Sequence, residues 1–261
     1  MLKDKIVFIT GASSGIGAAC AKQFAQLGVN LLLCARRLEP VNELAQQLVA
    51  AYGIDVHALQ LDVRQPTQVI DVIKALPNQW QAIDILINNA GLAAGLDSIQ
   101  DGVIQDWEDM IDTNIKGLLY VTRAIVPQMV ARNSGHIINI GSIAGHQVYP
   151  KGAVYCATKH AVNALSEGLR LDLFGTKIRV STVSPGAVET NFSLVRFKGD
   201  TKRAAAVYEG SCALTGDDVA DAVIYCATRK PHINISEVLI MPTDQASATQ
   251  RFRQNTLSDK P

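Results

Sequence analysis

Short apolar runs alternate along the chain with longer segments of helical periodicity. Apolar residues at helical spacing predict helices over 15–28, 39–53, 66–76, 106–130, 154–174 and 217–227. The segment between the sixth strand and the last of these helices shows neither pattern and is expected to be irregular. Seven strands are predicted from the runs KIVFIT (5–10), VNLLLCA (29–35), VHALQLDV (56–63), IDILINNAG (83–91), GHIINIGS (135–142), KIRVSTVSPG (177–186) and EVLIM (237–241).

The predicted strands are almost continuously apolar, as is typical of strands covered on both faces. Their regular alternation with helices indicates an α/β fold with a parallel, doubly wound sheet. Because the chain contains no linker, repeat or low-complexity segment, we expect one domain over residues 1–261. The tail after Asp244 is polar, and it is expected either to be loose or to dock on a neighbour.

Composition narrows the classes of protein to consider. The 24 Lys and Arg balance the 24 Asp and Glu, so no overall field favours nucleic acid or a membrane surface. The five cysteines are scattered, without CxxC pairs or histidines at ligand spacing, so we expect a reduced protein without a metal site. The N-terminus does not look like a signal peptide, and no stretch is long enough to span a bilayer. A cytoplasmic location is therefore expected.

A glycine-rich turn, TGASSGIG (10–17), joins the first strand to the first helix. Glycines permit a tight turn, and the exposed N–H groups of a helix start can bind a phosphate. The spacing is GxxxGxG, and its alternative explanation is a plain strand-to-helix turn that needs small residues. The candidate nucleotide-binding residues of this turn are Gly11, Ser13, Ser14, Gly15, Ile16 and Gly17.

The end of the second strand indicates which nucleotide is preferred. Enzymes that use NAD usually place an acidic residue here for the ribose hydroxyls, whereas this chain has Arg36 and Arg37. Arginine can pair with a 2′-phosphate and stack on adenine, so we predict NADP. The alternative is that both arginines are solvated charges at a helix start.

Tyr155 and Lys159 lie four residues apart on a predicted helix and therefore share one face. A tyrosine titrates near pH 10, and a nearby ammonium group is expected to lower that pKa. Tyr155 would then exchange a proton with an alcohol or a carbonyl. Ser142 follows the fifth strand, at the edge where ligands bind in such sheets, and its hydroxyl can hold the substrate oxygen.

With NNAG at 88–91, Asn114 in DTNIKG and SPG at 184–186, these motifs resemble the short-chain dehydrogenase/reductase family. The resemblance covers nearly the whole chain. It implies a single-domain Rossmann fold with a sheet of about seven strands. The cofactor half would span about 1–135, and the catalytic and substrate half about 136–245. The implied activity is hydride transfer between NADP(H) and the hydroxyl or carbonyl of a small molecule.

The resemblance also implies the roles of individual residues. Tyr155 would be the acid/base, and Lys159 would tune it and bind the nicotinamide ribose. Ser142 would hold the substrate oxygen, and Asn114 would hold a water in a proton relay. Asp62 and Val63 would flank the adenine. The remaining implied cofactor-binding residues are Asn89, Ala90, Gly91, Pro185, Gly186, Val188 and Thr190.

More local stretches, among them SPGAVETNFSLVRFKGD and MPTDQAS, resemble NADP-dependent 3-hydroxy acid dehydrogenases. That subgroup implies L-serine, L-allo-threonine or 3-hydroxyisobutyrate as substrates, and a homotetramer. Such an acid needs a cation for its carboxylate. Arg196 is the preferred candidate because arginine binds carboxylates bidentately, and Lys198 and Lys151 are alternatives.

Three other functions stay open at this point. The first is a general carbonyl reductase of uncharged ketones and aldehydes. The second is an NADP-binding regulatory protein without turnover, which has no need to keep Asn114, Ser142, Tyr155 and Lys159 together. The third is a structural module whose long helices (106–130 and 154–174) pack against a partner subunit.

Overall fold

The computed structural model describes residues 2–254 and places the predicted strands in one seven-stranded parallel sheet, confirming the α/β fold. The strand order is β3-β2-β1-β4-β5-β6-β7. Successive strands are added on one side of β1 up to β3 and on its other side from β4 onward, so the order reverses between β1 and β4. Ligands bind at such a switch point in open sheets. The strands are β1 (Ile6–Thr10), β2 (Asn30–Ala35), β3 (Val56–Gln60), β4 (Ile85–Asn88), β5 (Gly135–Ile140), β6 (Ile178–Pro185) and β7 (Glu237–Ile240).

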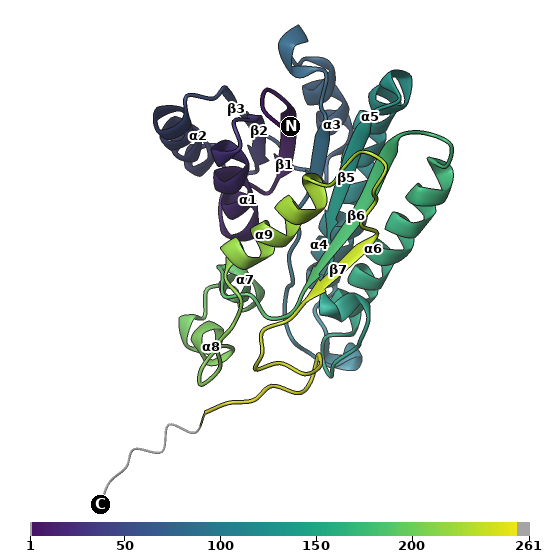
Figure 1. Cartoon of the computed structure of the whole chain (residues 1–261). Coiled ribbons are helices and arrows are strands. Elements are labelled where there is room, and N and C mark those ends of the chain that lie inside the picture. The colour runs from purple at the N-terminus through teal and green to yellow at the C-terminus, as the bar shows by residue number, and fades with distance from the viewer. Residues whose placement is uncertain (1, 255–261) are drawn as a thin grey trace, which may run out of the picture.

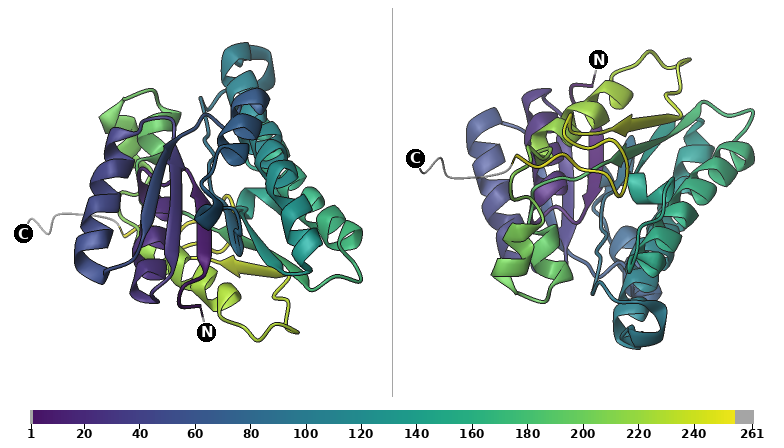
Figure 2. Two further views of the ribbon diagram at one scale, coloured as in Figure 1. Left: turned by 90° about the horizontal axis from the view of Figure 1, so that it is seen from above. Right: turned by 90° about the horizontal axis from the view of Figure 1, so that it is seen from below.

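Helices cover both faces of the sheet, as Figures 1 and 2 show. One layer contains α1 (Gly15–Gln26), α2 (Glu39–Tyr52) and α9 (Gly216–Ala227). The other contains α3 (Pro66–Lys74), α4 (Ile104–Ile111), α5 (Leu118–Arg132) and α6 (Ala153–Asp172). Side chains alternate between the two layers, because Val7 and Ile9 pack with α1 and α9 while Phe8 packs with α3 and α5. All three are fully buried, which explains the unbroken apolar run.

The helix predicted over 106–130 is not one regular helix. It is divided into α4 and α5 by a π-helical segment, η3 (Asp112–Gly117). The wider turn is accompanied by two hydrogen bonds of Asn114, which accepts from the Leu92 N–H at 2.9 Å and donates to the Leu92 carbonyl at 2.8 Å. Such bulges occur often at functional sites.

The segment expected to be irregular contains two short helices, α7 (Phe192–Arg196) and α8 (Thr201–Ala206). We call residues 192–206 the lid. Helices this short give too few turns for a periodic sequence signal. The start of α8 is stabilised by a local cap, in which the Asp200 carboxylate accepts a hydrogen bond from the Arg203 N–H at 3.0 Å.

The described part of the polar tail, up to residue 254, packs on its own chain beside the lid (Figure 2). Arg251 donates to the Val207 carbonyl at 2.6 Å, and the Gln254 N–H donates to the Gly210 carbonyl at 2.7 Å. Near its start, Gln245 accepts a hydrogen bond from the Ala187 N–H at 2.8 Å. The tail therefore docks on its own subunit; residues 255–261 lie outside the described residues.

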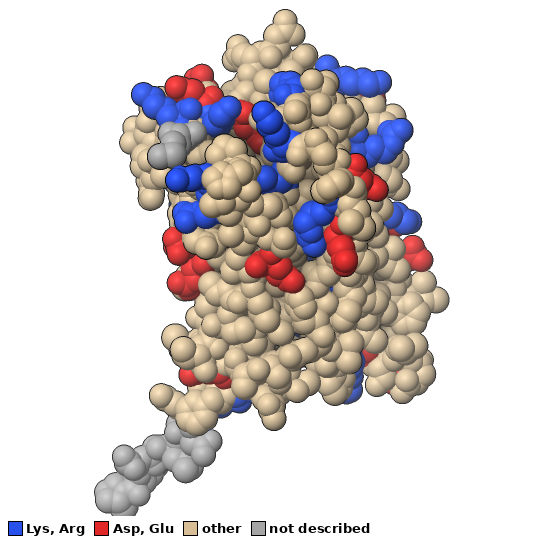
Figure 3. Space-filling model, turned by 45° about the vertical axis from the view of Figure 1, so that its right-hand side comes forward, with Lys and Arg blue, Asp and Glu red and all other residues tan. Residues whose placement is uncertain are grey.

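Charged side chains of both signs occur on the face shown in Figure 3. In the face shown in Figure 3, blue and red groups are mixed in the upper part and the lower part is largely uncharged. This pattern gives no extended basic patch on that face for a phosphate backbone. Across residues 2–254, no helix has both the length and the apolar character needed to cross a membrane.

Candidate active site

A cavity of about 690 Å³ follows the carboxyl ends of the strands and continues under the lid. It has the size and position expected of a cofactor and substrate site. Gly17 and Asn114 are not part of its wall. The predicted residues that line it are Gly11, Ser13, Ser14, Gly15, Ile16, Arg36, Arg37, Asp62, Val63, Asn89, Ala90, Gly91, Ser142, Tyr155, Lys159, Pro185, Gly186, Val188, Thr190 and Arg196.

The glycine turn is held in an unusual backbone conformation. Gly11 and Gly15 have φ values of +67° and +56°, which side chains rarely adopt. Asn89 fixes the turn by donating to the carbonyls of Thr10 at 2.8 Å and Gly11 at 3.1 Å. A side chain at Gly17 would clash with the Gly11 carbonyl oxygen. Gly17 thus supports the turn from behind, while the other glycines face the cavity.

Thr10 is a site residue that sequence reasoning did not single out. Its hydroxyl accepts hydrogen bonds from the backbone N–H groups of Asn89 and Ala90, each at 3.0 Å. It thereby joins the end of β1 to the end of β4 at the switch point. The available signal was a threonine that ends a buried strand immediately before a glycine turn.

The end of the cavity lined by Arg36 and Arg37 is positively charged. Arg36 and Arg37 are exposed and line the cavity, and within residues 2–254 neither forms an ion pair. Asp62 lies nearby, but Arg64 binds its carboxylate at 2.7 Å. Partial burial opposes ionisation, yet hydrogen bonds from Arg64 hold the pKa of Asp62 below its usual value. The acidic group is therefore already neutralised, and the two arginines remain available to an anion.

The structure brings the predicted catalytic side chains together. Ser142 follows β5 and caps a short helical turn, η4 (Ile143–Gly145), by accepting from the Ala144 N–H at 3.1 Å. Tyr155 and Lys159 lie on α6, both buried. The Lys159 ammonium donates to the carbonyl of Ile140 at 2.9 Å.

Asn114 sits immediately behind this group. A Cβ placed on Gly91 would be 3.3 Å from the Asn114 Oδ1 and 3.7 Å from the Lys159 Nζ, so both atoms lie near one point. Asn114 also donates to the Thr158 hydroxyl at 3.0 Å. Its amide therefore connects the η3 bulge to α6, which carries Tyr155 and Lys159.

The electrostatics of Tyr155 differ from the prediction. Burial raises the pKa of Tyr155, and the groups that oppose this effect are Arg196 and Ser142 rather than Lys159. Lys159 points toward the Ile140 carbonyl, with its Nζ 6.0 Å from the centroid of the Tyr155 ring. Burial also lowers the pKa of Lys159 to about 8. Burial thus favours the neutral phenol form of Tyr155.

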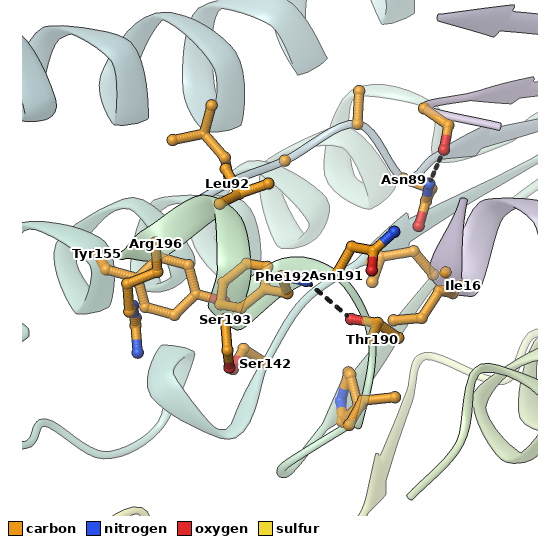
Figure 4. Close-up of a pocket in the computed structure, with 18 of the residues that line it drawn as sticks. Ile16, Asn89, Leu92, Ser142, Tyr155, Thr190, Asn191, Phe192, Ser193 and Arg196 are labelled. Carbon is orange, nitrogen blue, oxygen red and sulfur yellow. Dashed lines mark hydrogen bonds between the residues drawn. The ribbon is translucent and has the colours of Figure 1, made fainter. Parts of the chain in front are cut away.

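Arg196, at the end of α7, covers this tyrosine (Figure 4). Its guanidinium carbon lies 5.1 Å from the ring centroid of Tyr155, 5.4 Å from that of Phe192 and 5.7 Å from that of Tyr149. One amino group donates to the Tyr149 hydroxyl at 2.6 Å, while Nε is buried and has no partner among residues 2–254. Sequence reasoning missed Tyr149 and Phe192, because neither belongs to a catalytic or cofactor-binding motif or to a periodic pattern.

The two alternative cations are placed differently. Lys198 forms an ion pair with Asp106 at 2.9 Å, so its charge is already compensated by a carboxylate. Lys151 is exposed and does not line the large cavity. Of the three candidates, Arg196 alone lines that cavity.

A parallel α/β sheet with a glycine turn and a buried tyrosine–lysine pair defines a dehydrogenase of the nucleotide-binding type. A family model described as short chain dehydrogenase matches residues 5–199, so the chain belongs to the short-chain dehydrogenase/reductase family. This confirms the predicted family.

Similar proteins support a narrower comparison. The chain is 47% identical over 244 residues to "NADP-dependent 3-hydroxy acid dehydrogenase YdfG" of Salmonella typhi, covering 93% of this chain and 97% of the relative. It is 42% identical over 254 residues to "NADP-dependent 3-hydroxy acid dehydrogenase" of Schizosaccharomyces pombe, covering 97% and 98%. A solved structure, "The Closed form of serine dehydrogenase complexed with NADP+", superposes with a TM-score of 0.89 at 44% identity, covering 95% and 99% of the two chains.

Proposed function

We propose that this protein transfers a hydride between NADP(H) and the hydroxyl or carbonyl group of a small 3-hydroxy acid. L-serine, L-allo-threonine and 3-hydroxyisobutyrate are the proposed substrates. The names of the relatives support NADP and 3-hydroxy acids. The observation that carries the proposal is Arg196, whose guanidinium lies over Tyr155 in the cavity and has no acidic partner within residues 2–254.

The cavity fits NADP. The turn with positive φ at Gly11 and Gly15 presents backbone N–H groups at the start of α1, where a pyrophosphate is stabilised. Arg36 and Arg37 are free for the 2′-phosphate. When bound, NADP(H) supplies or accepts the hydride. The residues proposed to hold it further along the cavity are Asp62, Val63, Asn89, Ala90, Gly91, Lys159, Pro185, Gly186, Val188 and Thr190.

The protein's own contribution to the chemistry lies at the substrate oxygen. Ser142 and Tyr155 both line the cavity and present hydroxyl groups that can hold one oxygen atom. As a neutral phenol, Tyr155 is ready to donate its proton to a carbonyl during reduction. For oxidation the proton must leave Tyr155, and we propose that it moves toward Lys159 and a water held near Asn114. Because its pKa is lowered to about 8, the Lys159 ammonium can first release its own proton to that water and then take up the proton from Tyr155.

Arg196 would hold the carboxylate while the hydroxyl meets Tyr155. Its Nε is a buried donor without a partner, and such a donor is costly until a ligand satisfies it. A carboxylate accepts two parallel N–H bonds from one guanidinium, which fixes its orientation. The surrounding rings of Phe192 and Tyr149 exclude water from that contact. The same arrangement gives an uncharged alcohol no comparable hold.

The test is NADP⁺ reduction with L-serine, D-serine, L-allo-threonine, 3-hydroxyisobutyrate and an uncharged secondary alcohol, with NAD⁺ as the parallel cofactor. The expected result is selective turnover of the acids with NADP⁺. If only the uncharged alcohol is turned over, the substrate is not a 3-hydroxy acid and the protein is a general carbonyl reductase. Tight NADPH binding without any turnover would make it a regulatory protein.

We also propose a homotetramer. Large apolar side chains are exposed on the long helices, including Leu119 and Val130 of α5 and Leu171 near the end of α6. An equivalent helix of a second subunit would cover them. Light scattering measures the assembly directly, and a monomeric mass would refute the proposal. A cytoplasmic location rests on the five cysteines, all unpaired thiols in the described chain.

A further inference from the structure

A buried carboxylate lies behind the Arg196 side chain. Asp106, on α4, is only 6% exposed, and the Lys198 ammonium lies 2.9 Å from its Oδ1. Lys198 belongs to the lid, between α7 and α8, and its side chain is 61% exposed. The ion pair therefore joins a buried acid on α4 to an exposed lysine between the two short helices of the lid.

Arg196 is held against the same part of the protein. Its carbonyl oxygen accepts a hydrogen bond from the Gly95 N–H at 3.0 Å. A Cβ at Gly95 would lie 3.0 Å from a carboxylate oxygen of Asp106 and 3.0 Å from one of Asp97. The backbone that binds Arg196 thus passes directly beside the Asp106 carboxylate.

A small cavity of about 20 Å³ connects these groups. Asp106, Arg196 and Tyr155 all contribute to its wall, and both Arg196 and Tyr155 also line the large cavity. Arg196 therefore borders two anion positions. One is the carboxylate of the proposed substrate in the large cavity, and the other is Asp106 in the small one.

A buried carboxylate needs a cation, because an unpaired charge away from water is strongly disfavoured. Lys198 supplies that cation, and within residues 2–254 the Arg196 side chain has one hydrogen bond, to Tyr149, and an unsatisfied Nε. Within the described residues, two basic residues besides Lys198 come into question because they line the small cavity with Asp106: Lys151, which is exposed, and Arg196. An Arg196 captured by Asp106 would no longer be available to a substrate.

We propose that Lys198 is a positioning residue that occupies Asp106 and thereby keeps Arg196 free for the substrate carboxylate. This inference rests on the proposed function, since it assumes an acidic substrate. It gives Lys198 an indirect role in specificity, although the lysine itself does not line the large cavity. A lid that was merely latched by the ion pair would affect charged and uncharged substrates alike.

The experiment compares steady-state constants for 3-hydroxyisobutyrate and for 2-methyl-1,3-propanediol, which replaces the carboxylate with an alcohol. Lys198→Gln is expected to raise KM for the acid about tenfold, with kcat and the constants for the diol within about twofold of the parent. Adding Asp106→Asn is expected to restore the acid KM, because no carboxylate remains to capture Arg196. Lys202→Gln, an exposed lysine of the same lid, is the matched control and is expected to change neither substrate.

An unchanged acid KM in Lys198→Gln would overturn the inference. So would an equal loss for both substrates that Asp106→Asn does not restore. If the double variant does not fold, Lys198→Arg decides: this variant keeps the cation and is expected to keep the acid KM, and loss there would count against the inference. Arg196→Ala in the same panel separates the two proposals. If Arg196→Ala leaves the preference for the acid intact, the proposed function is wrong, and this inference with it. If Arg196→Ala abolishes that preference while Lys198→Gln has no effect, only this inference is wrong.

Discussion

Burial of the Lys159 ammonium should make the stability of the cofactor-free protein depend on pH in a defined way. The pKa of Lys159 is lowered by burial from 10.5 to about 8. Below pH 8 the amine is charged in both the folded and unfolded chains, and the folded state carries the full burial cost. Between pH 8 and 10.5 the unfolded chain binds more protons than the folded one, so stability rises with pH. The full shift corresponds to about 3 kcal/mol.

The perturbation is Lys159→Met, which keeps the length of the side chain and removes the charge. From the two pKa values, the unfolding free energy of the parent should rise relative to the variant by about 2 kcal/mol between about pH 7 and about pH 9.5. Tyr155 has a raised pKa, so its contribution is lost only above pH 10. Cys20 and Cys34 have pKa values raised to about 12, so their contributions to the free energy of unfolding are lost above pH 9. These groups are present in both proteins, and their effects cancel in the difference.

The assay is urea unfolding followed by circular dichroism, at one protein concentration and a series of pH values. Lys177→Met is the matched control, because that lysine is exposed at the start of β6. Its difference from the parent is expected to be flat over the same range. A flat difference for Lys159→Met as well would refute the reasoning, since it would mean that burial does not disfavour the Lys159 ammonium.

Three further predictions concern the cofactor turn, the choice of nucleotide and the proton donor. Arg36→Ala with Arg37→Ala should raise KM for NADP⁺ by roughly tenfold to a hundredfold and leave that for NAD⁺ unchanged; equal effects on both would remove the 2′-phosphate from the explanation. Gly17→Ala should abolish NADPH binding in a fluorescence titration. Gly168 on α6 faces open space, so Gly168→Ala should bind NADPH normally and increase the free energy of unfolding by up to about 1 kcal/mol. Tyr155→Phe should lower kcat by roughly a hundredfold or more with NADPH affinity intact, and near-parental turnover would assign proton transfer elsewhere.

The elements of the sheet were predictable because each depends on local sequence. An unbroken apolar strand and an amphipathic helix are visible in short windows, and the glycine turn at 10–17 is contiguous. The pair Tyr155 and Lys159 was accessible for the same reason, since four residues on one helix fix their relative position. Strand bounds differ from the predicted ones mainly at the carboxyl ends, where the chain leaves the sheet to form the cavity.

Features that depend on distant contacts were not predictable. The π-helical turn is fixed by the bonds of Asn114 to Leu92, which lies on another strand connection. The raised pKa of Tyr155 requires knowledge of its burial, and the direction of the Lys159 side chain is set by the Ile140 carbonyl. The docking of the tail depends on carbonyl groups beyond the lid that become visible only when the chain is folded.

The cation candidates show the same limit. Sequence alone left Arg196, Lys198 and Lys151 as alternatives, because all three follow or precede motif segments. The folded structure separates them by two observations: Asp106 pairs with Lys198, and Lys151 does not line the large cavity. Both observations depend on contacts between segments that are far apart in the chain.

The central claim is that Arg196 selects a carboxylate while Tyr155 handles the reacting oxygen. The most direct measurement is kcat/KM of Arg196→Ala for 3-hydroxyisobutyrate and for 2-methyl-1,3-propanediol, followed by the absorbance of NADPH. A charge-assisted contact of about 2–3 kcal/mol predicts a loss of roughly 30-fold to 160-fold for the acid and less than about threefold for the diol. Equal losses for both substrates, or none for either, would contradict the account.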